Sequence, residues 1–150
     1  LNNSAYNPTD SITVEAWVRP SSSQSGESPI VYKEDQYYLF VNSSNTPQFK
    51  IYTGGVWNTI SSGVNLTSDR WAHVSATYNG VDMKIYVNGE LKNTSSLSGN
   101  IGTTTNALYI GGESSTSNFY SGRIDEVRIW STVLTQGQIQ SNYNIKHTNY

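Results

Sequence analysis

Residues 71–94 have the sequence WAHVSATYNGVDMKIYVNGELKNT, and this stretch decides the fold. Two runs of alternating apolar and polar residues, 71–78 and 83–87, each end at an Asn-Gly pair, at 79–80 and at 88–89. Asn-Gly between alternating runs is the strongest short-range hairpin signal, because it favours a turn whose central residues have positive φ. A third run begins at Leu91. The stretch therefore predicts a three-stranded antiparallel meander.

The same alternation recurs along the rest of the chain and indicates an all-β protein. In residues 12–19 the apolar side chains alternate with Thr13, Glu15, Trp17 and Arg19, and Pro20 ends the run. Further strands are expected at 30–33, 37–41, 48–52, 107–110 and 123–130. Thr135 and Gln138 form a capping-box pattern that predicts one short helix through residue 143. No linker or internal repeat divides the chain, so we expect one domain over residues 1–150.

Composition excludes several classes of function. Only 13% of the 150 residues are charged, the net charge is −2 and there is no cysteine. Nucleic-acid binding needs clustered cations, and disulfides or Cys-based zinc sites need cysteine. No apolar run is long enough to cross a membrane. The low charge and the many Ser, Thr and Asn residues favour an extracellular domain, secreted or at the cell surface, cut from a longer protein.

Several motifs resemble one known family. They are residues 11–20 (SITVEAWVRP), 70–74 (RWAHV), 85–89 (IYVNG) and 122–130 (GRIDEVRIW). In this order they resemble LamG-like jelly-roll domains of the concanavalin A-like lectin/glucanase superfamily, to which pentraxins are related. The resemblance implies a two-sheet antiparallel β-sandwich with one short C-terminal helix. It also implies lectin-like binding of carbohydrate.

The large strand residues have structural interpretations. Trp17, Trp71 and Trp130 lie inside expected strands, where a large ring is usually part of the core. Glu15 and Arg128 each neighbour such a ring and are expected to form a partly buried ion pair.

The sequence argues against catalysis. Glucanases of this superfamily use paired carboxylates on one strand face, but the nearest match, residues 123–128 (RIDEVR), has arginine where both glutamates should lie. Asp125 and Glu126 are adjacent, so a strand points them to opposite faces. The two histidines, His73 and His147, are expected in a packed strand and in a frayed tail. We therefore expect a protein that is not an enzyme.

A calcium hypothesis follows from the resemblance to pentraxins. Their calcium loops occupy the places of residues 33–36 and 112–118, which implies Asp35, Gln36, Glu113 and Asn118 as metal ligands. Ser114 and Ser115 replace the acidic or amide residues that follow the glutamate in pentraxins. We therefore expect at most one weakly bound Ca²⁺ ion, and the alternative is that both loops are solvated turns.

Four aromatic residues lie in or beside loops and are candidates for stacking on a sugar: Tyr37, Trp57, Phe119 and Tyr120. Trp57 follows Gly54-Gly55 and either stacks on a ligand or folds back onto the sheet. The sequence thus predicts a non-catalytic module that binds a glycan or a cell-surface glycoprotein. The alternative is a structural or adhesive domain that contacts proteins, including neighbouring domains of its own chain. The hypothesis of one recognition rim requires Asp35 and Glu113 to lie at the same end of the molecule.

Overall fold

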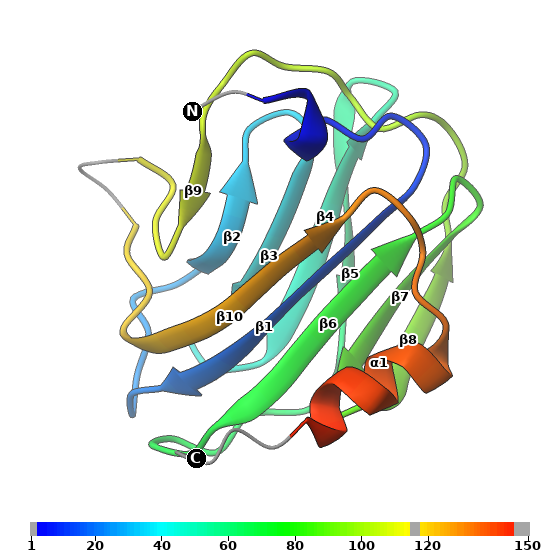
Figure 1. The fold of residues 1–150 in the computed structure, drawn as a ribbon. Helices are drawn as coiled ribbons and strands as arrows, with labels where there is room; N and C mark the ends of the chain where they lie inside the picture. Colours follow the sequence, from blue (N-terminus) through cyan, green and yellow to red (C-terminus); the bar gives the residue numbers. More distant parts are fainter. Residues whose placement is uncertain (1–2, 115–117, 146–150) are drawn as a thin grey trace.

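The computed structural model describes residues 3–114 and 118–145, which form two stacked antiparallel β-sheets (Figure 1). In sheet A the strand order is β10 (Gly122–Trp130), β1 (Ile12–Pro20), β6 (Ala72–Tyr78), β7 (Asp82–Val87) and β8 (Glu90–Ser96). In sheet B the order is β5 (Val56–Ser61), β4 (Pro47–Thr53), β3 (Tyr37–Val41), β2 (Ser28–Lys33) and β9 (Leu108–Ile110). A 3₁₀ turn, η1 (Ser4–Tyr6), precedes the sheets and the helix α1 (Gln136–Asn144) follows them. The predicted sandwich is confirmed.

The core lies between the sheets and follows the alternation of the strands. In β1, the side chains of Ile12, Val14, Ala16 and Val18 are fully buried and face sheet B. In β4, burial alternates residue by residue, so Phe49 and Ile51 point inward and the residues between them outward. Each sheet therefore has one inner face of aliphatic and aromatic side chains and one outer face that points away from the other sheet.

The two Asn-Gly pairs form different turns. Asn88 and Gly89 both have positive φ, 51° and 77°, as a two-residue type I′ hairpin turn requires. At the first pair only Gly80 has positive φ, 84°, and the Asn79 amide donates to the carbonyl of Asp82. Gly80 and Val81 are therefore the central residues of that turn. The predicted meander of β6, β7 and β8 is confirmed.

One strand was not expected. β5 pairs with β4 through the Gly54-Gly55 turn, where both glycines have positive φ. Its sequence, VWNTIS, does not alternate regularly between apolar and polar residues, and only Ile60 is buried, because β5 is an edge strand with a largely accessible surface. The pairing places Trp57 directly opposite Tyr52.

The predicted helix is confirmed and lies on the outer face of sheet A (Figure 1). Its capping box is complete: the Gln138 amide donates to Thr135 Oγ1 at 3.2 Å, and the Thr135 amide donates to Gln138 Oε1 at 2.9 Å. The ring of Tyr143 stacks on Trp17 with centroids 5.7 Å apart. No helix of the described residues is long and apolar enough to cross a membrane.

The tryptophan predictions need correction. Trp17 is 8% exposed, but it is buried beneath α1 and not between the sheets. Trp71 is half-buried, and Trp130 is 39% exposed at the end of β10. Alternation explains the positions of Trp17 and Trp130. Trp17 shares the outward face of β1 with Thr13, and Trp130 pairs with Thr13, so both rings point away from sheet B.

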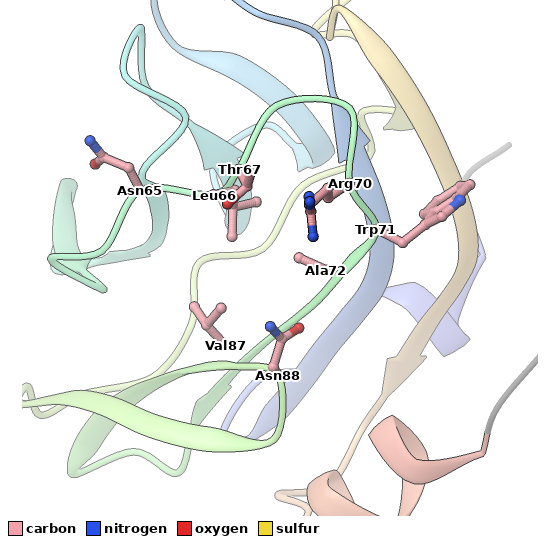
Figure 2. Close-up of a pocket in the computed structure, with 8 residues that line it drawn as sticks. All are labelled: Asn65, Leu66, Thr67, Arg70, Trp71, Ala72, Val87 and Asn88. Atoms are coloured by element: carbon pink, nitrogen blue, oxygen red, sulfur yellow. The ribbon is translucent and has the colours of Figure 1, made fainter. Parts of the chain in front are cut away.

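A pocket of ≈ 190 Å³ lies where β6 begins and β7 ends (Figure 2). The connection from β5 to β6 forms one side and the β7–β8 turn forms the other. Its lining residues are Asn65, Leu66, Thr67, Arg70, Trp71, Ala72, Val87 and Asn88.

Candidate ligand-binding face

The outer face of sheet B gathers six aromatic side chains, here called the aromatic face: Tyr32, Tyr38, Phe40, Tyr52, Trp57 and Tyr109. Strand register places them together, because directly paired residues share a face. Tyr32 pairs with both Tyr38 and Tyr109, and Tyr52 pairs with Trp57. Lys50 pairs with Tyr38, and Tyr52 lies two residues further along the same strand. The aromatic face thus extends across all five strands of sheet B, about 19 Å at the usual strand spacing.

The rings pack against one another in two groups. Tyr38 contacts Tyr32 edge-on at a centroid distance of 5.0 Å and lies 4.5 Å from Phe40. Tyr52 and Trp57 form a T-shaped pair at 5.2 Å. Tyr38 and Phe40 are buried, whereas Tyr32, Tyr52, Trp57 and Tyr109 are half-exposed. Four rings therefore offer apolar surface to solvent, and three of them, Tyr32, Tyr52 and Trp57, are held by contacts with a neighbouring ring.

An ion pair between Lys50 and Glu27 lies on the Phe40 side of the aromatic face. The Lys50 Nζ lies 4.8 Å from the centre of the Phe40 ring and 5.5 Å from that of Tyr38. Both carboxylate oxygens of Glu27 accept hydrogen bonds from it at 2.7 Å. The loop that carries Glu27 is held by Gln24, whose side chain exchanges two hydrogen bonds with the backbone of Ser121. The cation–π contacts and the ion pair fix Lys50 over the buried rings.

Glu113 and Asn118 meet over the aromatic face. Glu113 Oε1 accepts a hydrogen bond from the Tyr38 hydroxyl at 2.8 Å, and its Oε2 accepts one from Asn118 Nδ2 at 2.6 Å. Burial and the hydrogen bond to Glu113 raise the pKa of Tyr38 above its ordinary range. Burial, followed by the negative charges of Glu34, Glu113 and Asp35, raises the pKa of Tyr32 to about 12. Both phenols are therefore neutral hydrogen-bond donors at neutral pH.

Asp35 and Gln36 lie elsewhere, in the turn between β2 and β3. Gln36 is fully buried: its Nε2 donates to the Gly102 carbonyl at 2.8 Å, and its Oε1 has no hydrogen-bond partner among the described residues. Gly111, two residues before Glu113, donates its amide hydrogen to the carbonyl of Ile30, near the start of β2, whereas Asp35 follows the end of that strand. The negative charges of both Asp35 and Glu113 act on Tyr32, which lies between these two points on β2. A shared recognition rim for Asp35 and Glu113 stays a prediction.

The calcium site with these four ligands stays a prediction. Calcium needs six to eight oxygens around one point. Gln36 is fully buried, and both Glu113 oxygens already accept hydrogen bonds, from Tyr38 and from Asn118. Among the described residues, no group of three or more His, Cys, Asp or Glu side chains could hold a metal ion.

The predicted aromatic ligands have different positions. Trp57 lies on the aromatic face, half-exposed. Phe119 is 56% exposed in the loop that follows β9, whereas Tyr120 packs against the core with its hydroxyl buried. The prediction for Tyr37 is wrong: its side chain is fully buried and its hydroxyl donates to the Tyr6 carbonyl at 2.9 Å. Since side chains alternate along β3, it is the next residue, Tyr38, that points outward.

Sequence reasoning missed Tyr32, Tyr52 and Tyr109. A signal for Tyr52 was present, because residues 47–53 alternate and Gly54-Gly55 is a two-residue hairpin turn. Such a turn pairs the residues on either side of it and would have placed Tyr52 opposite Trp57. For Tyr32 and Tyr109 there was no comparable signal, because β2 and β9 are far apart in the sequence.

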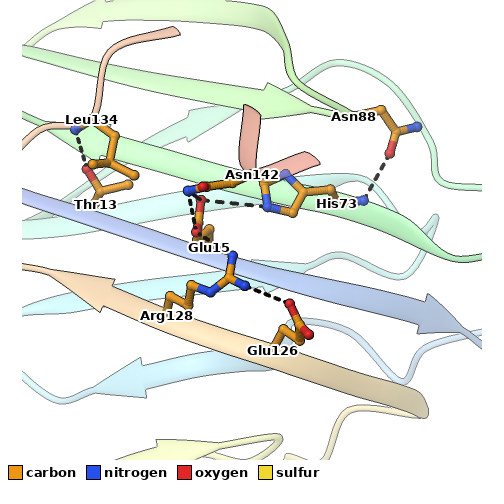
Figure 3. A network of polar contacts seen from close by, with 8 residues as sticks. All are labelled: Thr13, Glu15, His73, Asn88, Glu126, Arg128, Leu134 and Asn142. Carbon is orange, nitrogen blue, oxygen red and sulfur yellow. Dashed lines mark hydrogen bonds and ion pairs between the residues drawn. The ribbon is translucent and has the colours of Figure 1, made fainter. Parts of the chain in front are cut away.

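The polar residues considered for catalysis form a structural network on the outer face of sheet A (Figure 3). The predicted Glu15–Arg128 pair is confirmed at 3.3 Å, and His73 Nε2 lies 3.6 Å from Glu15. Arg128 also donates to Glu126 at 2.8 Å. Burial, followed by the charge of Arg128, lowers the pKa of His73 to about 4, so His73 is neutral at neutral pH. These groups are held by one another beneath α1, away from the aromatic face.

The fold and the aromatic face define a class of protein, the lectin-type β-sandwich binding domain. The chain belongs to the concanavalin A-like lectin/glucanases superfamily, whose family model matches residues 1–140. Mouse pappalysin-1 is 27% identical to this chain over an alignment 164 residues long, gaps included. The alignment covers 90% of this chain and 10% of that protein. The chain therefore spans about a tenth of the length of this curated relative.

Three solved structures share the fold. Domain 4 of the extracellular arabinanase AbnA from Geobacillus stearothermophilus, in complex with arabinotriose, is 19% identical with a TM-score of 0.71 and coverages of 89% of this chain and 66% of that one. The CBM40 of the Ruminococcus gnavus IT-sialidase, bound to α2,3-sialyllactose, is 15% identical with a TM-score of 0.75 and coverages of 91% and 84%. A heptameric SAP-like pentraxin from Limulus polyphemus is 19% identical with a TM-score of 0.68 and coverages of 92% and 72%.

Proposed function

We propose that this domain is a non-catalytic carbohydrate-recognition module that binds a glycan on the aromatic face of sheet B. The observation that carries the proposal is the row of four half-exposed rings, Tyr109, Tyr32, Tyr52 and Trp57, on one rigid sheet face. Sugar rings present C–H faces that stack on aromatic rings and hydroxyls that need fixed polar partners. Two of the matched structures were solved with oligosaccharides, which supports the same ligand class.

The polar groups of the face are suited to sugar hydroxyls. The phenols of Tyr32 and Tyr38 stay protonated, and Lys50, Glu113 and Asn118 are held by hydrogen bonds before a ligand arrives. Pre-ordered side chains lose little conformational entropy on binding. The face is about four strand spacings wide, so it suits an oligosaccharide better than a single sugar.

The proposal includes an extracellular location and the absence of catalysis. A location outside the cell is supported by the low charge of the chain and by the extracellular arabinanase that shares its fold. The absence of catalysis is supported by the sequence of β10, where Arg123 and Arg128 occupy the places of the glucanase carboxylates, and by the matched binding domains. The match to a small part of a large relative supports neighbouring domains as partners.

A glycan array with matched tryptophan variants tests the proposal. Trp57→Ala is expected to weaken binding at least tenfold, because it removes the largest exposed ring of the face. Trp130→Ala is the control, since it removes a tryptophan that is 39% exposed on sheet A. Circular dichroism confirms that each variant folds. Full glycan binding by a folded Trp57→Ala variant contradicts the proposal, and capture of a protein partner without any glycan signal favours the adhesive alternative.

Calcium is a separate and smaller part of the proposal. Glu113 and Asn118 alone offer one carboxylate and one amide, fewer oxygens than calcium usually takes. We therefore propose that one calcium ion binds at this pair with millimolar affinity. A thermal melt with and without 5 mM CaCl₂ tests it, because a specific ligand raises the midpoint of unfolding. An equal midpoint, or an equal shift in Glu113→Gln, removes calcium from the proposal.

A further inference from the structure

The pocket at the start of β6, called here the Arg70 pocket, lies apart from the aromatic face. Its lining residues come from the β5–β6 connection, from the first residues of β6 and from the β7–β8 turn (Figure 2). The aromatic face lies on the outside of sheet B, whereas this pocket lies at the end of the sandwich where the chain passes from sheet B to sheet A. A ligand in one site does not occupy the other.

The guanidinium of Arg70 has no hydrogen bond or ion pair to the described residues. The neighbouring carboxylate, Asp69, lies 4.0 Å from Arg19, which also donates to the Asp69 carbonyl at 2.9 Å. Arg70 is exposed, and Figure 2 shows its side chain directed into the pocket between Leu66 and Ala72. The pocket therefore contains a positive charge that the protein itself leaves unneutralised.

The amides around the pocket add a hydrogen-bond donor. The side-chain oxygen of Asn88 already accepts a hydrogen bond from the His73 amide at 2.9 Å, so its Nδ2 group is left to donate. The oxygen of Asn65 is likewise taken, by the hydroxyl of Thr46 at 2.6 Å. In Figure 2, Asn88 and Arg70 approach the space between them from opposite sides. Both amide oxygens are thus occupied, and the Arg70 guanidinium and the Asn88 Nδ2 are the side-chain donors that an anion would meet there.

The floor and size of the pocket define the rest of the ligand. Leu66, Ala72 and Val87 are 6–8% exposed and form an apolar floor. The volume of ≈ 190 Å³ equals that of about six water molecules in the bulk liquid, which suits one sugar ring and not a chain of them. An apolar floor next to a cation fits a ring with a C–H face and a carboxylate at its edge.

We propose that the Arg70 pocket binds the carboxylate of an acidic sugar residue such as a hexuronate. The guanidinium donates two parallel hydrogen bonds to the carboxylate, the Asn88 amide donates to the carboxylate or to an adjacent hydroxyl, and the ring rests on Leu66, Ala72 and Val87. This is a second site, independent of the aromatic face, that selects for charge.

Titration of ¹⁵N-labelled protein with D-glucuronate, followed by NMR, tests this inference. Glucuronate is expected to shift the backbone amides of Leu66, Ala72 and Asn88, and glucose or glucuronamide at the same concentration is not, because both lack the negative charge. Arg70→Gln is expected to weaken binding at least tenfold. Arg70→Lys is expected to weaken it as well, since an ammonium does not make the paired contact.

A matched control variant and two further ligands make the result decisive. Arg123→Gln removes the same charge from an exposed position on β10 and should leave glucuronate binding unchanged. If acetate binds with the same affinity as glucuronate, the assignment to a sugar is overturned, because the apolar floor then adds nothing to the affinity. Tighter binding of a peptide with a free C-terminal carboxylate overturns it too. Glucuronate shifts that persist in Arg70→Gln overturn the role of the pocket.

Discussion

The side-chain nitrogen of Asn142, in α1, lies 2.9 Å from Oε1 of Glu15, in β1, so the C-terminal helix is hydrogen-bonded to a fully buried carboxylate. Arg128 and His73 contact the same carboxylate from β10 and β6. One side chain in the centre of sheet A thus connects three strands and the helix. Its contacts explain why an acidic residue is tolerated at 0% exposure.

Replacement of Glu15 by alanine is expected to destabilise the protein by about 3–5 kcal/mol, because it leaves the charge of Arg128 half-buried without this partner and frees Asn142. Chemical denaturation measures the free energy of unfolding. Glu90→Ala is the control: Glu90 also forms an ion pair, with Lys92, but in an exposed position, and its loss should leave the unfolding midpoint unchanged. Similar losses in the two variants would contradict the central role of Glu15.

As the pH is lowered from 6.5 to about 4, the protein is expected to lose stability because of His73. Its pKa is about 4 in the folded protein and 6.5 in the unfolded chain, so in this range the unfolded chain binds a proton that the folded protein does not. The contribution of His73 to the free energy of unfolding is complete above pH 6.5. By pH 4 the free energy of unfolding has declined by as much as about 3 kcal/mol. Denaturation at several pH values measures the slope. His73→Gln should have a shallower slope over this range, and an unchanged slope would exclude His73 as its source.

Tyr37→Phe is expected to lower the stability of the protein without changing its glycan binding. The change removes the hydrogen bond from the hydroxyl to the Tyr6 carbonyl, at a cost of about 1 kcal/mol, and preserves the buried ring. Glycan binding should be unchanged, because Tyr37 faces the core. Denaturation and the glycan array measure the two effects, and a loss of binding without a loss of stability would place Tyr37 in the ligand site.

Gly102→Ala is expected to destabilise the protein by roughly 1–3 kcal/mol through overpacking. A Cβ at this position would lie 2.2 Å from the Asp35 carbonyl oxygen and 2.8 Å from Cδ1 of Tyr52. The β2–β3 turn or the Tyr52 ring must move, so glycan binding should weaken too. Gly137→Ala, in the first turn of α1, has no such contact and should be neutral or stabilising. Equal stability of the two variants would show that the loop adapts freely.

The sequence predicted the sandwich because its strongest signals are local. Alternation in β1 and the turn at Asn88-Gly89 fix strand boundaries and faces from residues that are close together in the chain. The same locality explains the confirmed capping box at Thr135. The edge strand β5 was missed because its apolar residues, Val56, Trp57 and Ile60, do not alternate with polar ones, as a largely exposed strand has no need to bury one face.

The candidate site was predicted less well, because it depends on which strands become neighbours. Tyr32 lies opposite Tyr109 only because β2 pairs with β9. The same pairing brings Glu113, which follows β9, within hydrogen-bond distance of the Tyr38 hydroxyl. Trp57 was found because it follows a turn signal directly. Tyr37 was chosen over Tyr38 by an error of one residue, which in a strand reverses the face.

One edge strand of each sheet, β8 in sheet A and β9 in sheet B, is a poor template for further pairing. β9 is three residues long, and β8 carries Glu90 and Lys92 among polar residues along its whole length. Short and charged borders discourage edge-to-edge aggregation. Extension of either sheet by a neighbouring copy of this domain is therefore disfavoured at these two borders, which matters wherever domains stand close together.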